Sequence, residues 1–266
     1  MYRLVAVDLD DTLLNGNFEI GPRARRALAL AQEKGVTVTL ATGRMYRSAR
    51  PIAQELGLTA PLITYQGALV KDAAGEEYAH YPVPVPWARE VIRCLQARGC
   101  HINVYVNDNL YMRSLTPGGA RYATISRVPV HVVEDVEETL ALGAPTKVLA
   151  IAAPEEVDLL LRELAPAFTG RLHVTKSKPH FLEISHPLAT KGRALASLAG
   201  QLGVPREAVL AIGDGYNDLD MLAFAGLGAA VANACPEARA AAGYVAGAAE
   251  DAGVAEIIER FVLEAD

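Results

Sequence analysis

The chain has 266 residues, which suits two domains of ordinary size, and 51% of them are hydrophobic, so a sizeable core can form. Its 25 basic and 31 acidic residues give a net charge of −6 without a long Lys/Arg block, which argues against nucleic acid or an anionic membrane as a partner. Because no secretory signal or membrane-length apolar run occurs, we expect a cytoplasmic protein.

The chain contains three cysteines, which is an odd number, and no C-x-x-C pair. A framework of paired disulfides or a zinc site would need a different pattern. We therefore expect Cys94, Cys100 and Cys235 to be reduced, partly buried thiols that bind no metal.

The first predicted element is a strand over Leu4–Val7, whose four consecutive apolar residues indicate burial on both faces of a parallel sheet. Three acids follow it directly, at Asp8, Asp10 and Asp11. Clustered carboxylates raise each other's pKa, so such a cluster is costly unless a cation or a chemical step uses it. An acidic turn that caps the next element is the alternative. We favour a functional site, because open α/β sheets bind ligands at the carboxyl ends of their strands.

Strands and helices then alternate. A helix is predicted from Pro22 to about Lys34, followed by a β-branched strand at 36–40 and a second helix that ends near Leu56. A third strand at 61–65 leads into Gln66-Gly67. This order predicts a doubly wound parallel sheet with crossover helices.

The alternation stops after a predicted hairpin at 69–81, and the proline-rich stretch 82–86 suits a domain boundary. A mixed set of elements follows, at 87–98, 102–106, 110–113, 130–133, 147–152, 155–168, 172–175 and 181–184. The alternation resumes at Thr190. The predicted fold is therefore α/β, with a Rossmann-like parallel-sheet core from residues 1–82 and 187–266 and an α+β cap domain inserted at 83–186.

The second core segment carries further polar groups. Lys191 begins a helix, and a buried strand at 208–212 ends in a loop that contains Asp214, Asn217 and Asp218. In a doubly wound sheet these groups converge with Asp8 and Asp10 and with Thr42, which follows the second strand. Individually they could be a helix cap, a surface lysine and a tight turn. Together they offer oxygen ligands for a hard divalent cation and donors for a phosphate.

Four segments in this order resemble the haloacid dehalogenase-like phosphatases, in particular the Cof-type branch, whose large cap follows the third core strand. They are Asp8-Leu9-Asp10-Asp11-Thr12-Leu13-Leu14, Ala41-Thr42-Gly43-Arg44, Lys191-Gly192 and Gly213-Asp214-Gly215-Tyr216-Asn217-Asp218. The resemblance covers the whole chain. It implies a phosphomonoester hydrolase that acts on small phosphorylated metabolites, such as sugar phosphates, through an aspartyl-phosphate.

The resemblance implies a role for each matching residue. Asp8 would be the nucleophile, and Asp10 would be the general acid and then the general base. Thr42 and Lys191 would complete the catalytic set by holding the transferring phosphoryl group. The residues implied for substrate binding are Gly43, Arg44, Lys191 and Asn217.

The implied cofactor is Mg²⁺, with metal-site residues Asp8, Asp10, Asp214 and Asp218. A phosphomutase of the same superfamily and a non-catalytic module that binds phosphate and Mg²⁺ are the alternative functions.

The chain departs from the family at two positions. Asp11 stands where the family often has Gly, and we expect its side chain to point away from the metal. Gln66-Gly67 stands where Asn-Gly is common, which leaves the role of Gln66 open.

Within the insert, Ser177, Lys178, His180 and Glu183 either reach a ligand or form a solvated strand edge. Three histidines lie in or beside strand-like apolar runs and are expected to face solvent. They are His101, His131 and His173.

Overall fold

The computed structural model describes residues 1–246 and 252–264, and the chain divides into two compact units. The core unit comprises Met1–Gly43, Ala49–Tyr78 and Thr190–Asp266, and the insert unit comprises Arg44–Ser48 and Ala79–Ala189. The boundaries expected from the sequence, 82/83 and 186/187, lie a few residues inside the long segment of the insert unit. The core unit is thus built from both ends of the chain.

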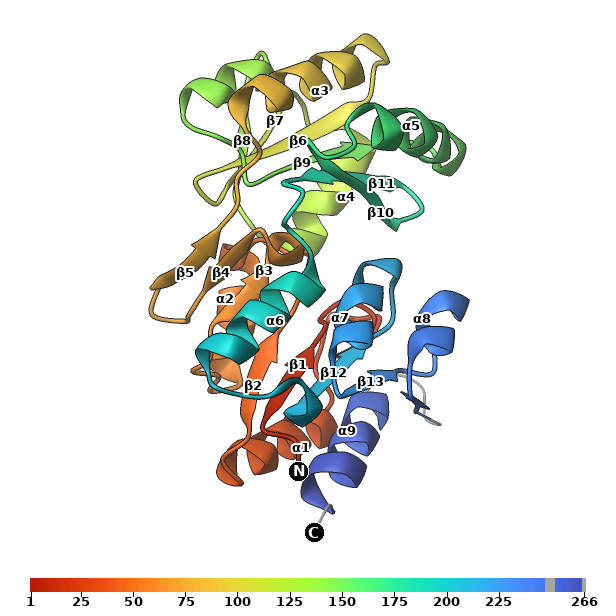
Figure 1. Ribbon diagram of the computed structural model, residues 1–266. Coiled ribbons are helices and arrows are strands. Elements are labelled where there is room, and N and C mark those ends of the chain that lie inside the picture. The colour runs from red at the N-terminus through yellow and green to blue at the C-terminus, as the bar shows by residue number, and fades with distance from the viewer. Residues whose placement is uncertain (247–251, 265–266) are drawn as a thin grey trace. The chain divides into compact units, whose positions relative to one another are not determined.

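A five-stranded parallel sheet forms the centre of the core unit, in the order β14-β13-β12-β1-β2 (Figure 1). Its strands are β1 (Leu4–Val7), β2 (Thr37–Leu40), β12 (Val209–Gly213), β13 (Leu227–Ala230) and β14 (Tyr244–Val245). All four residues of β1 are fully buried, as a strand covered on both faces requires. Both neighbours of β1 run parallel to it, Leu4 pairing with Val209 and with Thr37.

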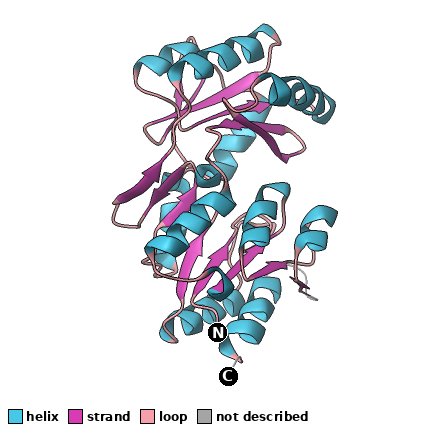
Figure 2. Ribbon diagram, viewed as in Figure 1, coloured by secondary structure: helices cyan, strands magenta, loops and turns pink. Residues whose placement is uncertain are grey.

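Helices flank this sheet (Figure 2). They are α1 (Pro22–Glu33), α2 (Tyr46–Glu55), α6 (Lys191–Gln201), α7 (Leu219–Phe224), α8 (Pro236–Ala241) and α9 (Ala252–Ile258), which continues as a π-helix over Glu259–Leu263. Apolar residues at helical spacing on α1, such as Ala24, Ala27, Leu28 and Ala31, are buried. Helix α1 packs against α9, and α6 packs against α7. The predicted α/β core is therefore present.

A smaller sheet of three strands continues from the end of the parallel sheet. It consists of β3 (Leu62–Thr64), β4 (Leu69–Lys71) and β5 (Glu77–His80). A parallel bridge between Ala41 and Ile63 joins the end of β2 to β3. A one-turn segment at Tyr65–Gly67 connects β3 to β4. The ends of β2 and β3 consequently lie side by side.

The insert unit has a six-stranded sheet in the order β10-β11-β9-β6-β7-β8, antiparallel except for β7 and β8. Its strands are β6 (His101–Val106), β7 (Asn109–Met112), β8 (Val130–Val132), β9 (Lys147–Ile151), β10 (His173–Lys178) and β11 (Phe181–Ser185). One face packs against α3 (Val85–Ala97) and α5 (Pro154–Ala167) in a single apolar core. Helix α4 (Pro117–Ser126) contributes Tyr122, which contacts Tyr105 and Phe181.

Helix α4 was not predicted from the sequence. Gly118 and Gly119 occupy its first turn, and glycine is a poor helix former. The signal that was present is a cap, because Thr116 accepts a hydrogen bond from the Gly119 amide at 3.1 Å and Pro117 follows it.

Polar side chains line the α4-side face of the insert sheet. The Lys147 ammonium, 2% exposed, pairs with the Glu183 carboxylate at 3.1 Å, and the Ser177 hydroxyl donates to Glu183 at 2.6 Å. Glu183 is therefore neither a solvated edge residue nor an open ligand contact. Lys178 and His180, by contrast, are exposed at the β10–β11 turn.

The expectation that His101 faces solvent is wrong. Its ring is half-buried between the Thr116 hydroxyl and the Asn103 amide, each 2.9 Å away. Because His101 lies on the face of β6 that α4 covers, its hydrogen bonds are made within the unit. His131 is exposed, as expected.

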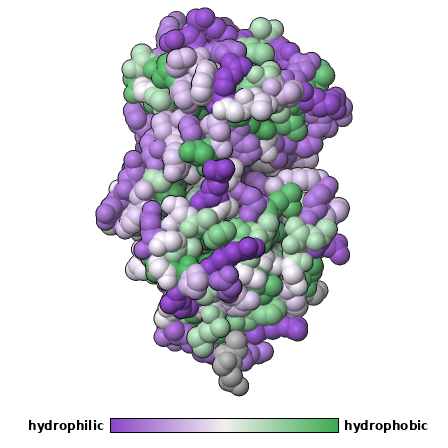
Figure 3. Space-filling view, viewed as in Figure 1, coloured by the Kyte–Doolittle hydropathy of each residue, from purple (hydrophilic) through white to green (hydrophobic). Residues whose placement is uncertain are grey.

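Among residues 1–246 and 252–264, no helix combines the length and the apolar composition that a membrane span requires. The face drawn in Figure 3 mixes hydrophilic and hydrophobic side chains on both units.

Burial lowers the pKa of His101 below its ordinary 6.5, while the hydrogen bond to Asn103 raises it. The unfolded chain therefore binds a proton more readily, so this residue's contribution to stability is present above about pH 6.5 and is lost as the pH falls through its folded pKa. We predict that thermal scans from about pH 7.5 to about pH 5 will show a smaller loss of Tm for His101→Gln than for the unmodified protein. Equal pH dependence in the two proteins would refute the assignment.

Candidate active site

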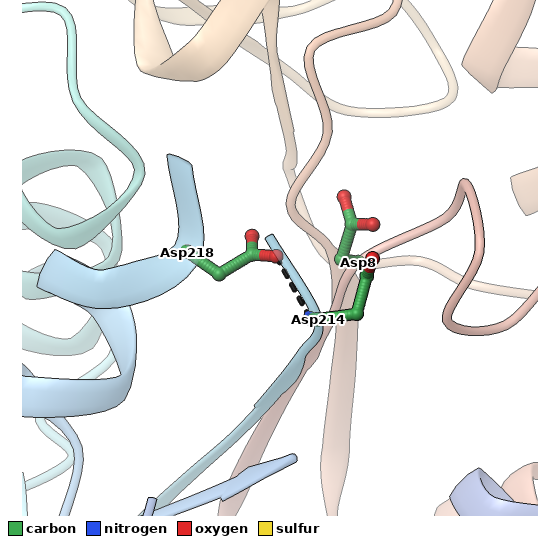
Figure 4. A group of neighbouring side chains, drawn as sticks. All are labelled: Asp8, Asp214 and Asp218. Carbon is green, nitrogen blue, oxygen red and sulfur yellow. Dashed lines mark hydrogen bonds between the residues drawn. The ribbon is translucent and has the colours of Figure 1, made fainter. Parts of the chain in front are cut away.

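Three carboxylates meet beyond the ends of β1 and β12. Asp8 directly follows β1 and its amide donates to the Ile212 carbonyl at 2.9 Å, while Asp214 directly follows β12. Asp218 ends the short helix η4 (Tyr216–Asp218) that leaves the same loop. One oxygen from each of these acids lies within 4.8 Å of the others, and Figure 4 shows the three side chains gathered at the strand ends. The parallel register of β1 and β12 produces this cluster.

A buried ammonium partly balances the acids. The Lys191 Nζ atom donates to Asp8 Oδ1 at 2.5 Å and to Asp218 Oδ1 at 2.6 Å, and Lys191 is only 1% exposed. Lys191 is the first residue of α6, so the helix delivers the ammonium to the cluster. Charge-assisted hydrogen bonds of this kind are the strong ones in proteins.

The second oxygen of Asp218 fixes the loop itself. Asp218 Oδ2 accepts hydrogen bonds from the backbone amides of Asp214 at 3.0 Å and Gly215 at 2.9 Å. A Cβ atom added at Gly213 would lie 2.6 Å from the Asp218 carboxyl carbon, so a side chain there would displace the carboxylate. Glycine at 213 is thus required by the close approach of Asp218.

The pKa values of the cluster follow from burial and mutual repulsion. Burial raises the pKa of Asp8 well above its usual range, and the carboxylates of Asp218, Asp214 and Asp10 raise it further, against the lowering effect of Lys191. Burial also raises the pKa of Asp214 to about 6, although the Thr12 hydroxyl lowers it by donating a hydrogen bond. Burial lowers the pKa of Lys191, but Asp218 and Asp8 together raise it above its ordinary value. Lys191 therefore stays charged.

The donor set fits a hard divalent cation. If all three acids are ionised, three negative charges face one ammonium, which leaves two negative charges to be balanced. The grouped ligand atoms are carboxylate oxygens alone, the type that Mg²⁺ prefers. Asp8 and Asp214 suit direct coordination best, because both oxygens of Asp218 already accept hydrogen bonds.

The loop after β1 contains two further contacts. The Thr12 hydroxyl donates to Asp214 Oδ1 at 2.6 Å and so ties the two strand-end loops together. Asp11 is exposed and has a φ of 64°, a left-handed conformation that favours glycine but that Asp tolerates, and its carbonyl accepts from the Asn233 amide at 2.7 Å. This conformation explains why glycine would suit position 11. No local sequence pattern indicates the contact made by Asn233, whereas Thr12 lies within the acidic segment that follows β1.

The remaining predicted residues come from the ends of β2 and β12. Thr42 is fully buried, and its amide donates to the Ile63 carbonyl at 2.8 Å. Asn217 Nδ2 donates to Gln66 Oε1 at 3.0 Å, and Gly43 lies against the same Gln66 amide. The structure thus brings Thr42, Gly43 and Asn217 into contact with the Gln66 segment.

Asp10 and Arg44 are the two remaining predicted residues. Asp10 is partly buried in the loop after β1, near enough to raise the pKa of Asp8. Arg44 is buried and belongs to the insert unit.

Asp220 is a residue that sequence reasoning missed. Its carboxylate accepts a hydrogen bond from the Gly192 amide at 2.8 Å, and a Cβ at Gly192 would lie 2.6 Å from the Asp220 carbonyl carbon. This contact ties the first turn of α6 to α7 and so holds the base of the Lys191 side chain. A lone acid on a short helix gives no sequence signal for such a role.

Comparison with known proteins places these features in a family. The profile of the haloacid dehalogenase-like hydrolases matches residues 5–258. Two similar relatives are the HMP-PP phosphatase of Serratia proteamaculans, 31% identical over 89% of this chain and 86% of its own, and the 5-amino-6-(5-phospho-D-ribitylamino)uracil phosphatase YitU of Bacillus subtilis, 28% identical over 97% of both. The crystal structure of a haloacid dehalogenase-like hydrolase from Bacteroides thetaiotaomicron has a TM-score of 0.88 at 31% identity and covers 98% of this chain and 99% of that one. This likeness confirms the predicted fold class.

Removing the Lys191 charge should leave two buried acids, Asp8 and Asp218, without their cationic partner. We predict that Lys191→Met lowers the free energy of unfolding by about 3–5 kcal/mol, the usual cost of breaking a buried ion pair from one side. Urea titrations should show this loss. Adding Asp8→Asn should recover part of the free energy of unfolding, because it removes one of the two unpaired buried charges. Lys71→Met, which breaks the more exposed pair with Glu77, serves as the matched control and should cost about 0–1 kcal/mol. A Lys191→Met protein as stable as this control would contradict the charge balance described.

Proposed function

Because the chain belongs to the haloacid dehalogenase-like hydrolases and is a phosphatase of that type, we propose that it is an Mg²⁺-dependent hydrolase of small phosphorylated metabolites, such as sugar phosphates. The observation that carries this proposal is Lys191, buried between Asp8 and Asp218 beside Asp214. Such a group of acids would hold Mg²⁺, and the cation and the ammonium together would offset the negative charge of a phosphoryl group. The substrates in the names of the two relatives support the same substrate class.

In the proposed reaction Asp8 is the nucleophile. A carboxylate oxygen of Asp8 attacks phosphorus, the bond from phosphorus to the leaving oxygen breaks, and an aspartyl-phosphate forms. Asp10 gives its proton to the leaving oxygen. Asp10 then takes a proton from the attacking water, the bond from phosphorus to Asp8 breaks, and inorganic phosphate leaves with Asp8 restored.

The other side chains hold the phosphoryl group in line with Asp8. We assign this role to Lys191 and to the Thr42 hydroxyl, with Gly43, Arg44 and Asn217 contacting the substrate. Lys191 suits it because its ammonium already donates to the nucleophile at 2.5 Å. Catalysis of phosphoryl transfer depends mainly on such positioning and charge neutralisation.

The proposed Mg²⁺ ligands are the carboxylates of Asp8 and Asp214 and the main-chain carbonyl of Asp10. When bound, Mg²⁺ would supply positive charge beside the phosphoryl oxygens. Asp218, predicted as part of the metal site, is better suited to act indirectly, since it holds Lys191 and the Asp214 loop.

We further propose that the insert unit is the cap domain that selects substrates. Lys178 and His180 are its candidates for substrate contact because both are exposed, whereas Glu183 is occupied by Lys147.

Removal of the metal tests the proposed cofactor. Chelation should stop phosphate release from p-nitrophenyl phosphate, Mg²⁺ should restore it, and Ca²⁺ should inhibit it, because its larger and looser coordination shell spoils in-line geometry. Mg²⁺ should also raise the Tm of the unmodified protein but not that of Asp214→Asn, which loses a charged ligand. Full activity after chelation would sink the metal assignment, and an isomerised sugar phosphate without free phosphate would indicate a mutase instead.

A comparison of two substrates separates the proposed roles of the neighbouring acids Asp8 and Asp10. Asp10→Asn should slow phosphorylation of the enzyme by a sugar phosphate by roughly 10²–10⁴-fold, the range typical of general acid–base catalysis. Phosphorylation by p-nitrophenyl phosphate should suffer far less, because nitrophenolate leaves without a proton, and the aspartyl-phosphate should accumulate. Single-turnover measurements compare the two substrates.

Asp8→Asn is the control for this experiment and should show no turnover with either substrate. If Asp10→Asn slows both substrates equally and no intermediate accumulates, Asp10 acts through the shape of the loop and not as an acid.

A further inference from the structure

Three consecutive residues after β3 have a left-handed backbone. Their φ angles are 52° at Tyr65, 60° at Gln66 and 93° at Gly67. A residue other than glycine is strained in this region, and such strain persists where surrounding contacts hold it, commonly at functional sites. At Gly67 a Cβ atom would lie 2.4 Å from the Thr190 carbonyl oxygen, so glycine is required there. The strained turn therefore packs directly against the residue that caps α6.

This backbone places the Gln66 amide between two loops. Its Oε1 atom accepts the hydrogen bond from Asn217 Nδ2 at 3.0 Å, and a Cβ atom at Gly43 would lie 2.5 Å from its Nε2 atom. The main-chain amide of Gln66 also donates to the Thr42 carbonyl at 3.0 Å. The residue is only 4% exposed. Gln66 therefore connects the loop after β2 to the loop after β12.

The connection fixes the orientation of the Asn217 amide. Its nitrogen is held by Gln66, and its oxygen lies over Gly215, where a Cβ atom would come within 2.6 Å of it. An asparagine side chain in a loop otherwise rotates with little cost, because its terminal torsion is broad. Gln66 thus removes the freedom that Asn217 would have as a phosphate-binding group.

We propose that Gln66 is a positioning residue for phosphate binding, whose side chain fixes the Asn217 amide in the orientation that binds a phosphoryl group. This inference rests on the proposed function, since it takes Asn217 as a phosphate-binding residue. Gln66 acts through Asn217, so its loss should weaken binding of the substrate and the transition state alike. Such uniform losses raise KM and leave kcat unchanged.

The substitution Gln66→Asn separates this role from a structural one. Asn adopts the left-handed conformation more readily than other residues with a side chain, so the backbone strain should not increase. Its side chain is one methylene shorter, which withdraws the amide from Asn217. A residue needed only for the turn would be replaced by Asn without loss, whereas a positioning residue would not.

The experiment measures kcat and KM for p-nitrophenyl phosphate, Ki for inorganic phosphate, and Tm. Gln66→Ala and Gln66→Asn should raise KM and Ki together by about three- to tenfold, the effect of one hydrogen bond, with kcat within about twofold. Gln66→Asn should keep the Tm of the unmodified protein. Gln54→Ala, at an exposed glutamine of α2, is the matched control and should change none of these values.

A double-mutant cycle tests the route through Asn217. Gln66→Ala should add no more than about twofold to KM when Asn217 is already Ala, because the partner through which it acts is gone. Multiplicative losses in the double variant, or an unchanged KM in Gln66→Asn, would overturn the inference while leaving the proposed function standing. Absence of Mg²⁺-dependent phosphate release by the unmodified protein would instead overturn the proposed function, and this inference with it.

Discussion

The site depends on the Lys191 ammonium, because this buried group donates hydrogen bonds to the carboxylates of Asp8 and Asp218, which follow two different strands. Without it, Asp8 and Asp218 would face each other unbalanced. Several contacts hold Lys191 in place without touching its charge. The Gly192 amide is held by Asp220, and the Thr190 carbonyl packs against Gly67. The first turn of α6 is therefore held by contacts on two sides. These contacts restrict the position of the Lys191 ammonium more than a loop would.

The elements that the sequence predicted best are those with one unambiguous pattern. The apolar run of β1, the acids after it and the loop at 213–218 indicated both the parallel core and the clustered carboxylates, and the family resemblance built on them is confirmed. The reason is physical: a strand buried on both faces leaves a plain signature, and parallel strands bring their ends to one edge.

What the sequence did not reveal depends on contacts between distant residues. In the sequence Glu183 is indistinguishable from an exposed edge residue, because its partner Lys147 lies on another strand, β9. The sequence likewise does not show that Thr116, at the start of α4, contacts His101. Asp220 and Asn233 carry no local pattern that distinguishes them from surface groups. The unusual backbone at Tyr65 and Gln66 is equally hidden, because neither residue type favours it. Propensity is a weak guide wherever tertiary contacts decide the conformation.

The pairing of β1 with β12 has a consequence for synthesis on the ribosome. Strand β1 finds β2 early, but its other edge stays open until Val209 and the residues after it have been made, long after Ala79–Ala189 can have folded. An apolar strand with an open edge is a template for association with other chains, so the nascent protein is most vulnerable in that interval. The three clustered acids also come from both ends of the chain. A chain that terminates before Asp214 consequently lacks two of the three acids.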